Sequence, residues 1–462
     1  MRTAVRRFDV LDDIFYRGHH GRGAAEVMQG IWRFDSTVSA AEVAFLHAFL
    51  AAGPLNRRVR SPRIPWARRY FTTGGAVAPV YAEPEPIAVD EVVAWADRRA
   101  AAPLDVDNGP AWELSVARVA DGSSVITLTC SHLVSDGLGM ISAARDALGP
   151  DGSAGSEAAR VRWRDDLADA VALWVRVICG VVASLARGCV DRQVRAELFA
   201  ALRGRHDAAD QPVGAPRHRV PGVRPTAVLS VGADDWAQRV LTADATSTAL
   251  TAAIVADMVA RIRSAGGHGG CGAPVDITVP VAPALHSSIG SPGMLRMAEV
   301  QIMPTVDRAG SVREVADTLR AGYQDLDGDH GGNMGLGPPG GMPAELLQLL
   351  GDRWAHAIVP VPGAREALVS PLGDMGPMFD SIAGHTSTGM AVRSVTVTAP
   401  ATPGHGAGEQ DSTVTLRCWT AIAAGRFTLT FDAAPWAASD AHALRRLAQT
   451  TLADWGLTAQ AW

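Results

Sequence analysis

Lysine is absent from the 462-residue sequence, so all 42 basic residues are arginines. We attribute this bias to codon usage and draw no function from it. With 48 acidic residues the formal net charge is −6, which gives no basic surface of the kind that binds nucleic acid. Charged residues are also few, at 19% against 47% hydrophobic residues, and this composition excludes a disordered chain. The length allows two or three domains, each with its own core.

Cysteine is equally scarce and follows no metal-binding pattern. The five cysteines are scattered without C-x-x-C spacing, which argues against a disulfide framework and a zinc site and is typical of a reducing compartment. His19 and His20 lack i,i+4 spacing and a nearby acidic or thiol partner, so we expect no metal. The first ten residues carry charges, but no apolar core of signal-peptide length follows them. We therefore expect a cytoplasmic protein.

The sequence also lacks a dinucleotide-binding loop and an uncharged membrane-spanning run. No strand feeds a G-x-G-x-x-G loop, so the glycine-rich segment 328–341 is interpreted as a mobile or partner-facing loop, and no tightly bound cofactor is expected. Residues 168–190 are strongly apolar but contain Asp169, Arg176 and Arg187. Because a spanning helix tolerates buried charge poorly, we expect a helix that lies on the protein or on a membrane surface. Membrane contact should be peripheral at most.

Apolar periodicity and turn residues predict alternating helices and strands. Helices are predicted over residues 39–52, 90–102, 138–148, 163–202, 245–262 and 440–455. Strands are predicted over residues 111–118 and 125–130, as a hairpin or as neighbours, and over 227–231, 275–281 and 425–432. Residues 150–160 are interpreted as a linker, and the stretch 204–225, rich in proline and arginine, as the main boundary. The arginine cluster between Arg57 and Arg69 is typical of a solvated loop, with phosphate contact as the alternative.

One segment carries the residue types of a catalytic site, Ser131-His-Leu-Val-Ser-Asp-Gly137. His132 is predicted at the end of a strand, before a turn and a helix. An imidazole can take up a proton at neutral pH, which general base catalysis requires. Asp136 can fix the local geometry by pairing with an arginine, and Gly137 lets the chain turn sharply or a substrate approach the backbone.

Plainer interpretations of the same residues stay open. His132 could be an ordinary strand-end histidine. Cys130 shares the predicted strand face of His132, so a thiol nucleophile oriented by the imidazole is an alternative to a buried strand cysteine. Met294, Met297 and Met303 are interpreted as packing residues.

The pattern His132-x-x-x-Asp136-Gly137 resembles the HHxxxDG signature of the chloramphenicol-acetyltransferase-like superfamily, which includes nonribosomal-peptide condensation domains and bacterial wax ester synthase/diacylglycerol acyltransferases. Residues 103–114 resemble the Pro-Leu-Trp segment before the signature in the wax ester synthase branch. The apolar region 165–200, a strand, the helix 246–262 and residues 279–281 recur there in the same order. Residues 370–374 and 427–432 resemble later segments.

Three departures from the family pattern indicate a divergent member. Ser131 stands where the first histidine of the signature normally is. Pro-Ala-Trp replaces Pro-Leu-Trp, and the Asn-Asp pair expected near residues 246–248 is absent. Such changes fit an enzyme that serves secondary metabolism, with lipid metabolism as the alternative.

The resemblance implies an α/β (α+β) fold of two chloramphenicol-acetyltransferase-like lobes, each a mixed sheet flanked by helices, with a tunnel between them. We expect an N-terminal lobe carrying the motif over residues 1–160, a helical linker over 161–225 and a C-terminal lobe over 226–462. Donor and acceptor would enter the tunnel from opposite faces and meet at the histidine.

The resemblance also implies an acyltransferase. His132 would activate an alcohol or amine acceptor for direct attack on a thioester, with acyl-CoA favoured over an acyl-carrier-protein thioester as co-substrate. Ser131 and Asp136 would shape the loop, and Gly137 would leave room near the reacting carbonyl. The alternatives are a freestanding condensation enzyme that works with an acyl or peptidyl carrier protein, and a degenerate binding protein without catalysis.

Overall fold

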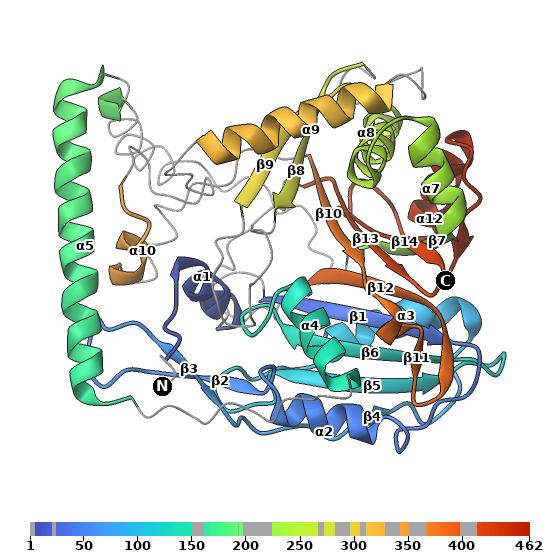
Figure 1. The fold of residues 1–462 in the computed structure, drawn as a ribbon, viewed down its shortest axis with the longest axis horizontal. Coiled ribbons are helices and arrows are strands. Elements are labelled where there is room, and N and C mark those ends of the chain that lie inside the picture. Colours follow the sequence, from blue (N-terminus) through green and yellow to red (C-terminus); the bar gives the residue numbers. More distant parts are fainter. Residues whose placement is uncertain are drawn as a thin grey trace.

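The structure is a computed structural model of the chain. It describes residues 5–20, 25–149, 161–192, 194–196, 224–266, 272–281, 296–304, 311–328, 342–350, 366–397 and 414–462. Within these ranges the strands form a six-stranded sheet, a seven-stranded sheet and a two-stranded ribbon (Figure 1). The predicted linker 150–160, almost all of the predicted boundary 204–225 and the glycine-rich segment after residue 328 lie outside the described residues.

The first sheet has the strand order β11–β12–β1–β6–β5–β4. Its strands are β1 (Ala25–Phe34), β4 (Tyr81–Ala82), β5 (Trp112–Arg118), β6 (Ser124–Ser131), β11 (Ser381–Ile382) and β12 (His385–Val397). Neighbouring strands are antiparallel except β4 and β5, which run parallel. The predicted pairing of the two strands before the motif is confirmed, because β5 and β6 pair antiparallel along their length.

The second sheet has the strand order β15–β7–β14–β13–β10–β8–β9. Its strands are β7 (Thr226–Gly232), β8 (Val275–Val281), β9 (Arg296–Ile302), β10 (Ala367–Asp374), β13 (Leu416–Ala423), β14 (Arg426–Ala433) and β15 (Gln460–Ala461). β10 runs parallel to both of its neighbours, β8 and β13, while the other pairs are antiparallel. Both sheets are therefore mixed, as predicted.

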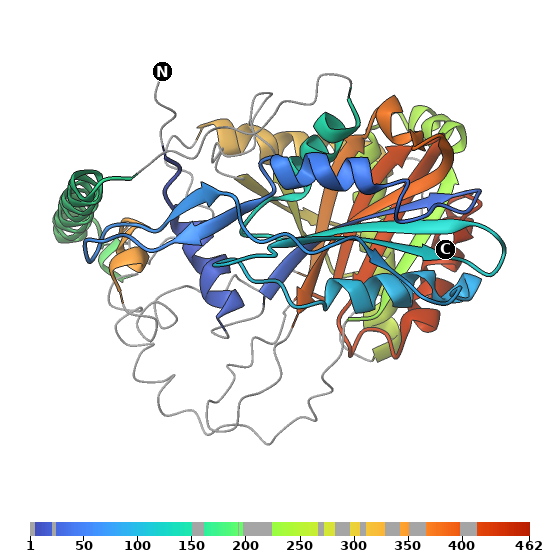
Figure 2. The same cartoon turned by 90° about the horizontal axis from the view of Figure 1, so that it is seen from below.

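Helices cover both sheets. They are α1 (Val10–His19), α2 (Ala44–Ala52), α3 (Val92–Ala100), α4 (Gly137–Leu148), α5 (Trp163–Val190), α7 (Ala233–Thr242), α8 (Ser247–Gly266), α9 (Ser311–Gly328), α10 (Leu346–Leu349) and α12 (Ala441–Asp454), with 3-10 turns at Val89–Glu91 and Pro377–Phe379. Figure 2 shows α2 and α4 on one face of the first sheet and α3 on the other. Alternation along β1 places Trp32 in the core under α2 and α4, and Ile31 in the core under α3.

The second lobe is built around α8, whose side chains are buried on almost every side. Residues of α7, α9 and α12 join the same core against one face of the second sheet. The opposite face meets the first lobe, since Ala421 and Ala423 of β13 pack with the core of the first sheet. The protein thus has the predicted two-lobed α/β fold.

The sheets do not follow the predicted division of the chain strictly. β11 and β12 lie within residues 226–462, yet they belong to the first sheet. β12 pairs with β1 from Ala25–Val397 to Phe34–Ser387, so a long ladder of backbone hydrogen bonds holds it there. The physical reason is the length of β12, whose 13 residues can pair with all of β1.

The arginine cluster between Arg57 and Arg69 is only in part the solvated loop that its composition predicts. Residues 57–60 form β2 (Arg57–Arg60), which pairs antiparallel with β3 (Tyr70–Thr73), and residues 61–69 form the loop between the two strands. Arg57 is buried, and Arg68 and Arg69 form ion pairs with Asp169 and Asp13. The correction has a plain cause, because the acidic partners lie far from the cluster in the sequence.

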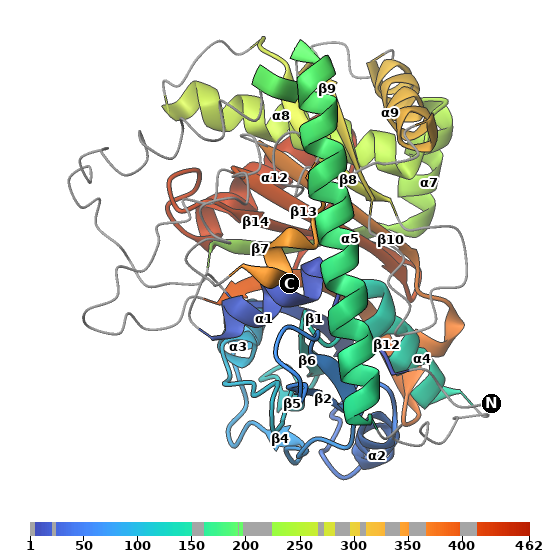
Figure 3. The ribbon, with the colours of Figure 1, turned by 90° about the vertical axis from the view of Figure 1, so that its left-hand side faces the viewer.

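Helix α5 stands along one edge of the molecule, beside both lobes (Figures 1 and 3). By length and composition it could cross a membrane, and most of its apolar window is not buried in the protein. Among the described residues, α7 and α8 pass the same test only as a pair bent by 89°. The two apolar helices thus differ in burial: α8 lies in the core of the second lobe, whereas most of α5 is exposed.

Candidate active site

The motif lies where the sequence places it, between a strand and a helix. β6 ends at Ser131 and α4 begins at Gly137. Asp136 is the N-cap of α4, and its carboxylate accepts a hydrogen bond of 2.7 Å from the backbone N–H of Gly139. This cap, rather than the arginine pairing expected from sequence, fixes the turn: the described residues give Asp136 no ion pair. The exposed carboxylate lies at the positive end of the helix, where a negative charge is favoured.

Gly137 is needed for packing between the two lobes. A Cβ atom at this position would stand 3.1 Å from Cε of Met28 on β1 and 3.3 Å from Cδ2 of Leu372 on β10. Both distances are tighter than ordinary side-chain contacts, so a larger residue would require the side-chain ends of Met28 and Leu372 to shift. The segment 370–374, singled out from the sequence, therefore reaches the motif from the second sheet.

His132 is half-buried beside the strand end. Its backbone N–H donates a 2.9 Å hydrogen bond to the carbonyl of Glu26 on β1. Its ring stacks on Phe15 of α1, with centroids 4.2 Å apart and planes inclined by 21°. In the described part of the chain no side chain forms a hydrogen bond with its ring nitrogens. The imidazole is thus oriented through its flat face while its nitrogens keep their bonding capacity.

Ser131 is fully buried and is held by a second residue of α1. Its Oγ lies 2.6 Å from Nε2 of His19 and accepts a 3.2 Å hydrogen bond from the N–H of Leu133. Phe15 and His19 are one helical turn apart, so one face of α1 contacts two consecutive residues of the motif. Sequence reasoning weighed His19 only as a metal ligand and missed this contact. No local signal marks it, because 112 residues separate the partners.

His19 and its neighbour His20 lie in different electrostatic surroundings. Burial, reinforced by the nearby His20, lowers the pKa of His19 to about 4, while Asp107 acts in the opposite direction. The His19 ring is therefore neutral near pH 7, with one nitrogen able to donate and one to accept. His20 is more exposed, and its Nε2 lies 3.0 Å from a carboxylate oxygen of Asp107. The hydroxyl of Tyr16 donates to the other oxygen at 3.1 Å.

Two buried groups lie behind the motif. Cys130 sits in the core of the first lobe, and burial raises the pKa of its thiol to about 12. A thiolate is not available there, so the structure speaks against the thiol nucleophile. The guanidinium of Arg57 lies 4.5 Å from the ring centre of Phe71, and burial, then the charge of Arg6, lower its pKa to about 9. Within the described residues its Nε has no hydrogen-bond partner.

Comparison with known proteins places the fold. No protein-family model matches the chain, and no curated protein matches it by sequence. Solved structures do match. The wax ester synthase/diacylglycerol acyltransferase from Marinobacter aquaeolei VT8 is 14% identical with a TM-score of 0.55, and the match covers 97% of this chain and 98% of that one. The chain shares its fold.

Two further structures show how widely this fold is used. The trichothecene 15-O-acetyltransferase from Fusarium sporotrichioides is 12% identical over 98% of this chain and 94% of that one, with a TM-score of 0.56. The first condensation domain of the CDA synthetase is 16% identical over 98% and 97%, with a TM-score of 0.52. Each match spans both lobes. At these identities the likeness establishes the chloramphenicol-acetyltransferase-like fold, and function has to be argued from the site.

Proposed function

We propose that this chain is an acyltransferase that moves an acyl group from a thioester to an alcohol or amine, with His132 as the general base. The observation that carries the proposal is the His132 ring, stacked on Phe15 with its nitrogens unengaged in the described residues. A base needs a fixed orientation and a free lone pair, and this arrangement offers both. Solved examples of the fold include an acetyltransferase and a condensation domain, which favours the same class of reaction.

The proposed reaction is a direct transfer. A ring nitrogen of His132 takes the proton from the acceptor hydroxyl or amine as its oxygen or nitrogen attacks the thioester carbonyl carbon. The new C–O or C–N bond forms, the C–S bond breaks, and the leaving thiolate takes the proton back from the imidazolium. No acyl-enzyme is needed, since the Cys130 thiol is protonated in the core and the Ser131 hydroxyl is fully buried.

His19 is assigned a positioning role in this scheme. Its hydrogen bond to Ser131 ties α1 to the strand end, and the same helix face presents Phe15 to the catalytic ring. Ser131 departs from the family signature, and the imidazole of His19 occupies the hydrogen-bonding position beside it. Asp136 and Gly137 complete the support through the cap of α4 and the contact with β10.

The donor is proposed to be acyl-CoA, with a carrier-protein thioester as the second candidate. Solved structures with this fold include an acyltransferase and a condensation domain, which motivates the two candidates. A third candidate is a non-catalytic binding protein, because Ser131 replaces the first histidine of the signature. The three readings differ in turnover and in donor, so one experiment separates them.

The experiment measures product formation by purified full-length protein with a panel of acyl-CoAs and acyl-carrier proteins and pooled alcohols and amines. Wild-type turnover should fall by about 10²–10⁴ in His132→Ala, because the proton acceptor is gone. His442→Ala is the matched control, since it removes an exposed imidazole on α12. The preferred donor identifies acyl-CoA transfer or carrier-protein condensation. Unchanged turnover in His132→Ala would refute the assigned base, and thioester binding without turnover would identify the binding protein.

A further inference from the structure

Helix α5 turns its apolar side outward. Six large apolar side chains, spaced three or four residues apart, form one stripe and are each 40–59% exposed: Leu167, Val171, Trp174, Ile178, Val182 and Leu185. The stripe extends for about 27 Å along the helix. A helix on a soluble protein normally shows the reverse pattern, with its apolar stripe against the core and its charges in water.

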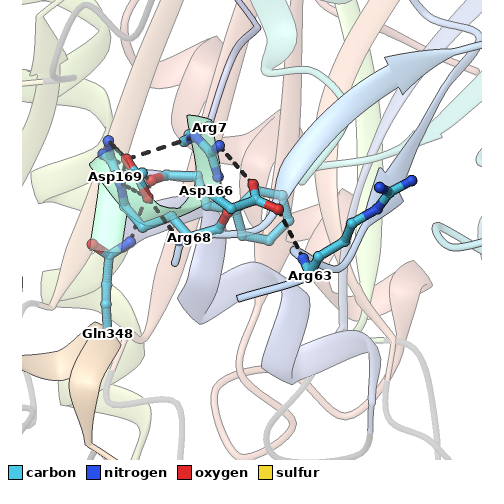
Figure 4. A network of polar contacts seen from close by, with 7 residues as sticks. Arg7, Arg63, Arg68, Asp166, Asp169 and Gln348 are labelled. Atoms are coloured by element: carbon cyan, nitrogen blue, oxygen red, sulfur yellow. Dashed lines mark hydrogen bonds and ion pairs between the residues drawn. The ribbon is translucent and has the colours of Figure 1, made fainter. Parts of the chain in front are cut away.

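Two acidic side chains of α5, Asp166 and Asp169, explain the inversion, because they face the protein (Figure 4). Asp166 forms an ion pair of 2.7 Å with Arg7 and accepts a 2.8 Å hydrogen bond from the backbone N–H of Arg63. Asp169 pairs with Arg68 at 2.6 Å and also accepts from its backbone N–H. Asp166 and Asp169 lie one turn apart, so these contacts fix the rotation of the helix about its axis.

A second contact holds the other half of α5. A Cβ atom at Gly180 would stand 2.7 Å from Cγ of Pro343, so the proline ring packs directly against the helix at this glycine. With both halves held, the outward stripe is a built feature of the fold.

The remaining exposed groups around the stripe indicate what covers it. Trp66 of the neighbouring loop is 64% exposed and lies edge-on to Trp174, with ring centres 6.3 Å apart, so the apolar patch continues beyond the helix. Exposed ionisable residues within α5 are Arg164, Arg176 and Arg187, with Asp165 as the one acidic residue. Arg164 borders the stripe, while Arg176 and Arg187 lie at the other edge of the exposed face of α5. An exposed apolar face that carries tryptophan and is edged by arginine is the combination that binds at the headgroup level of an anionic bilayer.

We propose that α5 is a membrane-surface helix that lies in the plane of a bilayer containing anionic lipid. A spanning orientation is excluded by the anchors, because a helix tied to the protein body through two paired aspartates cannot enter the hydrocarbon on all sides. Lying flat, the helix buries its stripe at the acyl boundary and leaves its arginines among the headgroups. The surface is separate from the motif and does not depend on the proposed reaction.

The experiment uses full-length protein and a probe on α5 beside the stripe. Cys179 is exposed on α5 one turn before Val182, while burial raises the pKa of both Cys130 and Cys418 and protects them from labelling. With Cys189→Ser and Cys271→Ser, an environment-sensitive fluorophore can be attached at Cys179 alone. Vesicles of phosphatidylcholine, with and without phosphatidylglycerol, are then added, and both binding and emission are followed.

The label should shift to the blue on vesicles that contain phosphatidylglycerol, and the protein should float with them. Ile178→Asp with Val182→Asp should lower vesicle binding at least about tenfold, because both carboxylates would enter the apolar boundary. Leu241→Asp, on a still more exposed apolar residue of α7, should bind like the wild type. Arg176→Gln should weaken binding to the anionic vesicles alone, by about fivefold.

Three outcomes would overturn the proposal. The first is a label whose emission does not change with either vesicle type, and the second is a double aspartate variant that binds vesicles as well as the wild type. The third is a dimer in solution that forms through the stripe. A mass of two chains by light scattering without vesicles, lost in the double variant, would assign the stripe to a second copy of the chain.

Discussion

His19 and His132 flank the same strand end, and the structure holds their rings in different ways. The His19 ring is drawn onto the buried hydroxyl of Ser131, and burial, with His20, lowers its pKa to about 4. The His132 ring is held by its flat face on Phe15, with its nitrogens unengaged in the described residues. A histidine whose nitrogens are occupied supports structure, whereas one held through its face keeps its lone pair for chemistry.

The comparison is tested most strongly by the same substitution at both positions. His132→Gln should lower kcat by about 10²–10⁴, because glutamine keeps the volume but cannot take up a proton. His19→Gln, whose amide can still bond the Ser131 hydroxyl, should lower kcat by about tenfold. Steady-state kinetics with one donor and acceptor pair give both values. Equal losses would mean that His19 takes part in the chemistry and is not a positioning residue.

The lowered pKa of His19 predicts a pH-dependent stability. The pKa of His19 is 6.5 in the unfolded chain and about 4 in the folded protein. Between these two pH values the unfolded chain binds a proton and the folded ring does not, so this contribution to stability is lost as the pH falls. We expect a loss of about 1–3 kcal/mol, reduced from the full linkage value because the ring is partly exposed. Urea unfolding at pH 7 and pH 4.5 measures it.

In that experiment His19→Gln should lose less stability than the wild type as the pH falls from 7 to 4.5. Burial raises the pKa of Asp12 to about 6, which acts in the opposite direction over the same range. Because Asp12 is present in both proteins, its contribution cancels in the difference. A wild type and variant with the same pH dependence would contradict the lowered pKa.

A smaller effect should appear in the coupling between His19 and Ser131. Each alanine variant leaves a buried polar atom without its partner, which costs about 1–3 kcal/mol, and the double variant removes both atoms. The double-mutant cycle should therefore give a coupling of about 1 kcal/mol in the free energy of unfolding. Additive losses would show that the 2.6 Å contact contributes nothing to stability.

The smallest effect is expected at Phe15. Phe15→Leu keeps an apolar contact but removes the stacked ring, so the free energy of unfolding should fall by about 0.5–1.5 kcal/mol. kcat/KM should fall a few-fold, because the imidazole is less firmly oriented. His19→Gln should leave this stacking in place and serves as the control. If Phe15→Leu lowered kcat/KM as much as His132→Gln does, the stacked ring would be as important for catalysis as the proposed base.

The local structure around the motif could be predicted from the sequence. Alternation predicted β6, and the Asp136-Gly137 turn predicted the start of α4, so the position of His132 was accessible without coordinates. The contacts of α1 were not, since nothing near Phe15 or His19 indicates a partner more than a hundred residues away. The ion pairs of the arginine cluster could not be predicted for the same reason, because the partner of Arg68 lies on α5. Apolar content alone also could not distinguish α8, which is buried, from α5, which is not.

The long strand β12 has a consequence for how the chain is made. The first sheet needs β12 beside β1, so synthesis must reach Val397 before that sheet can close. Until then one edge of β1 has no partner strand in the growing chain. Such an unpaired edge can pair with strands of other chains and so promote aggregation. Two gene fragments divided in the apolar helix would not encode two independent proteins. Each would depend on the other, and co-expression should recover what neither fragment can achieve alone.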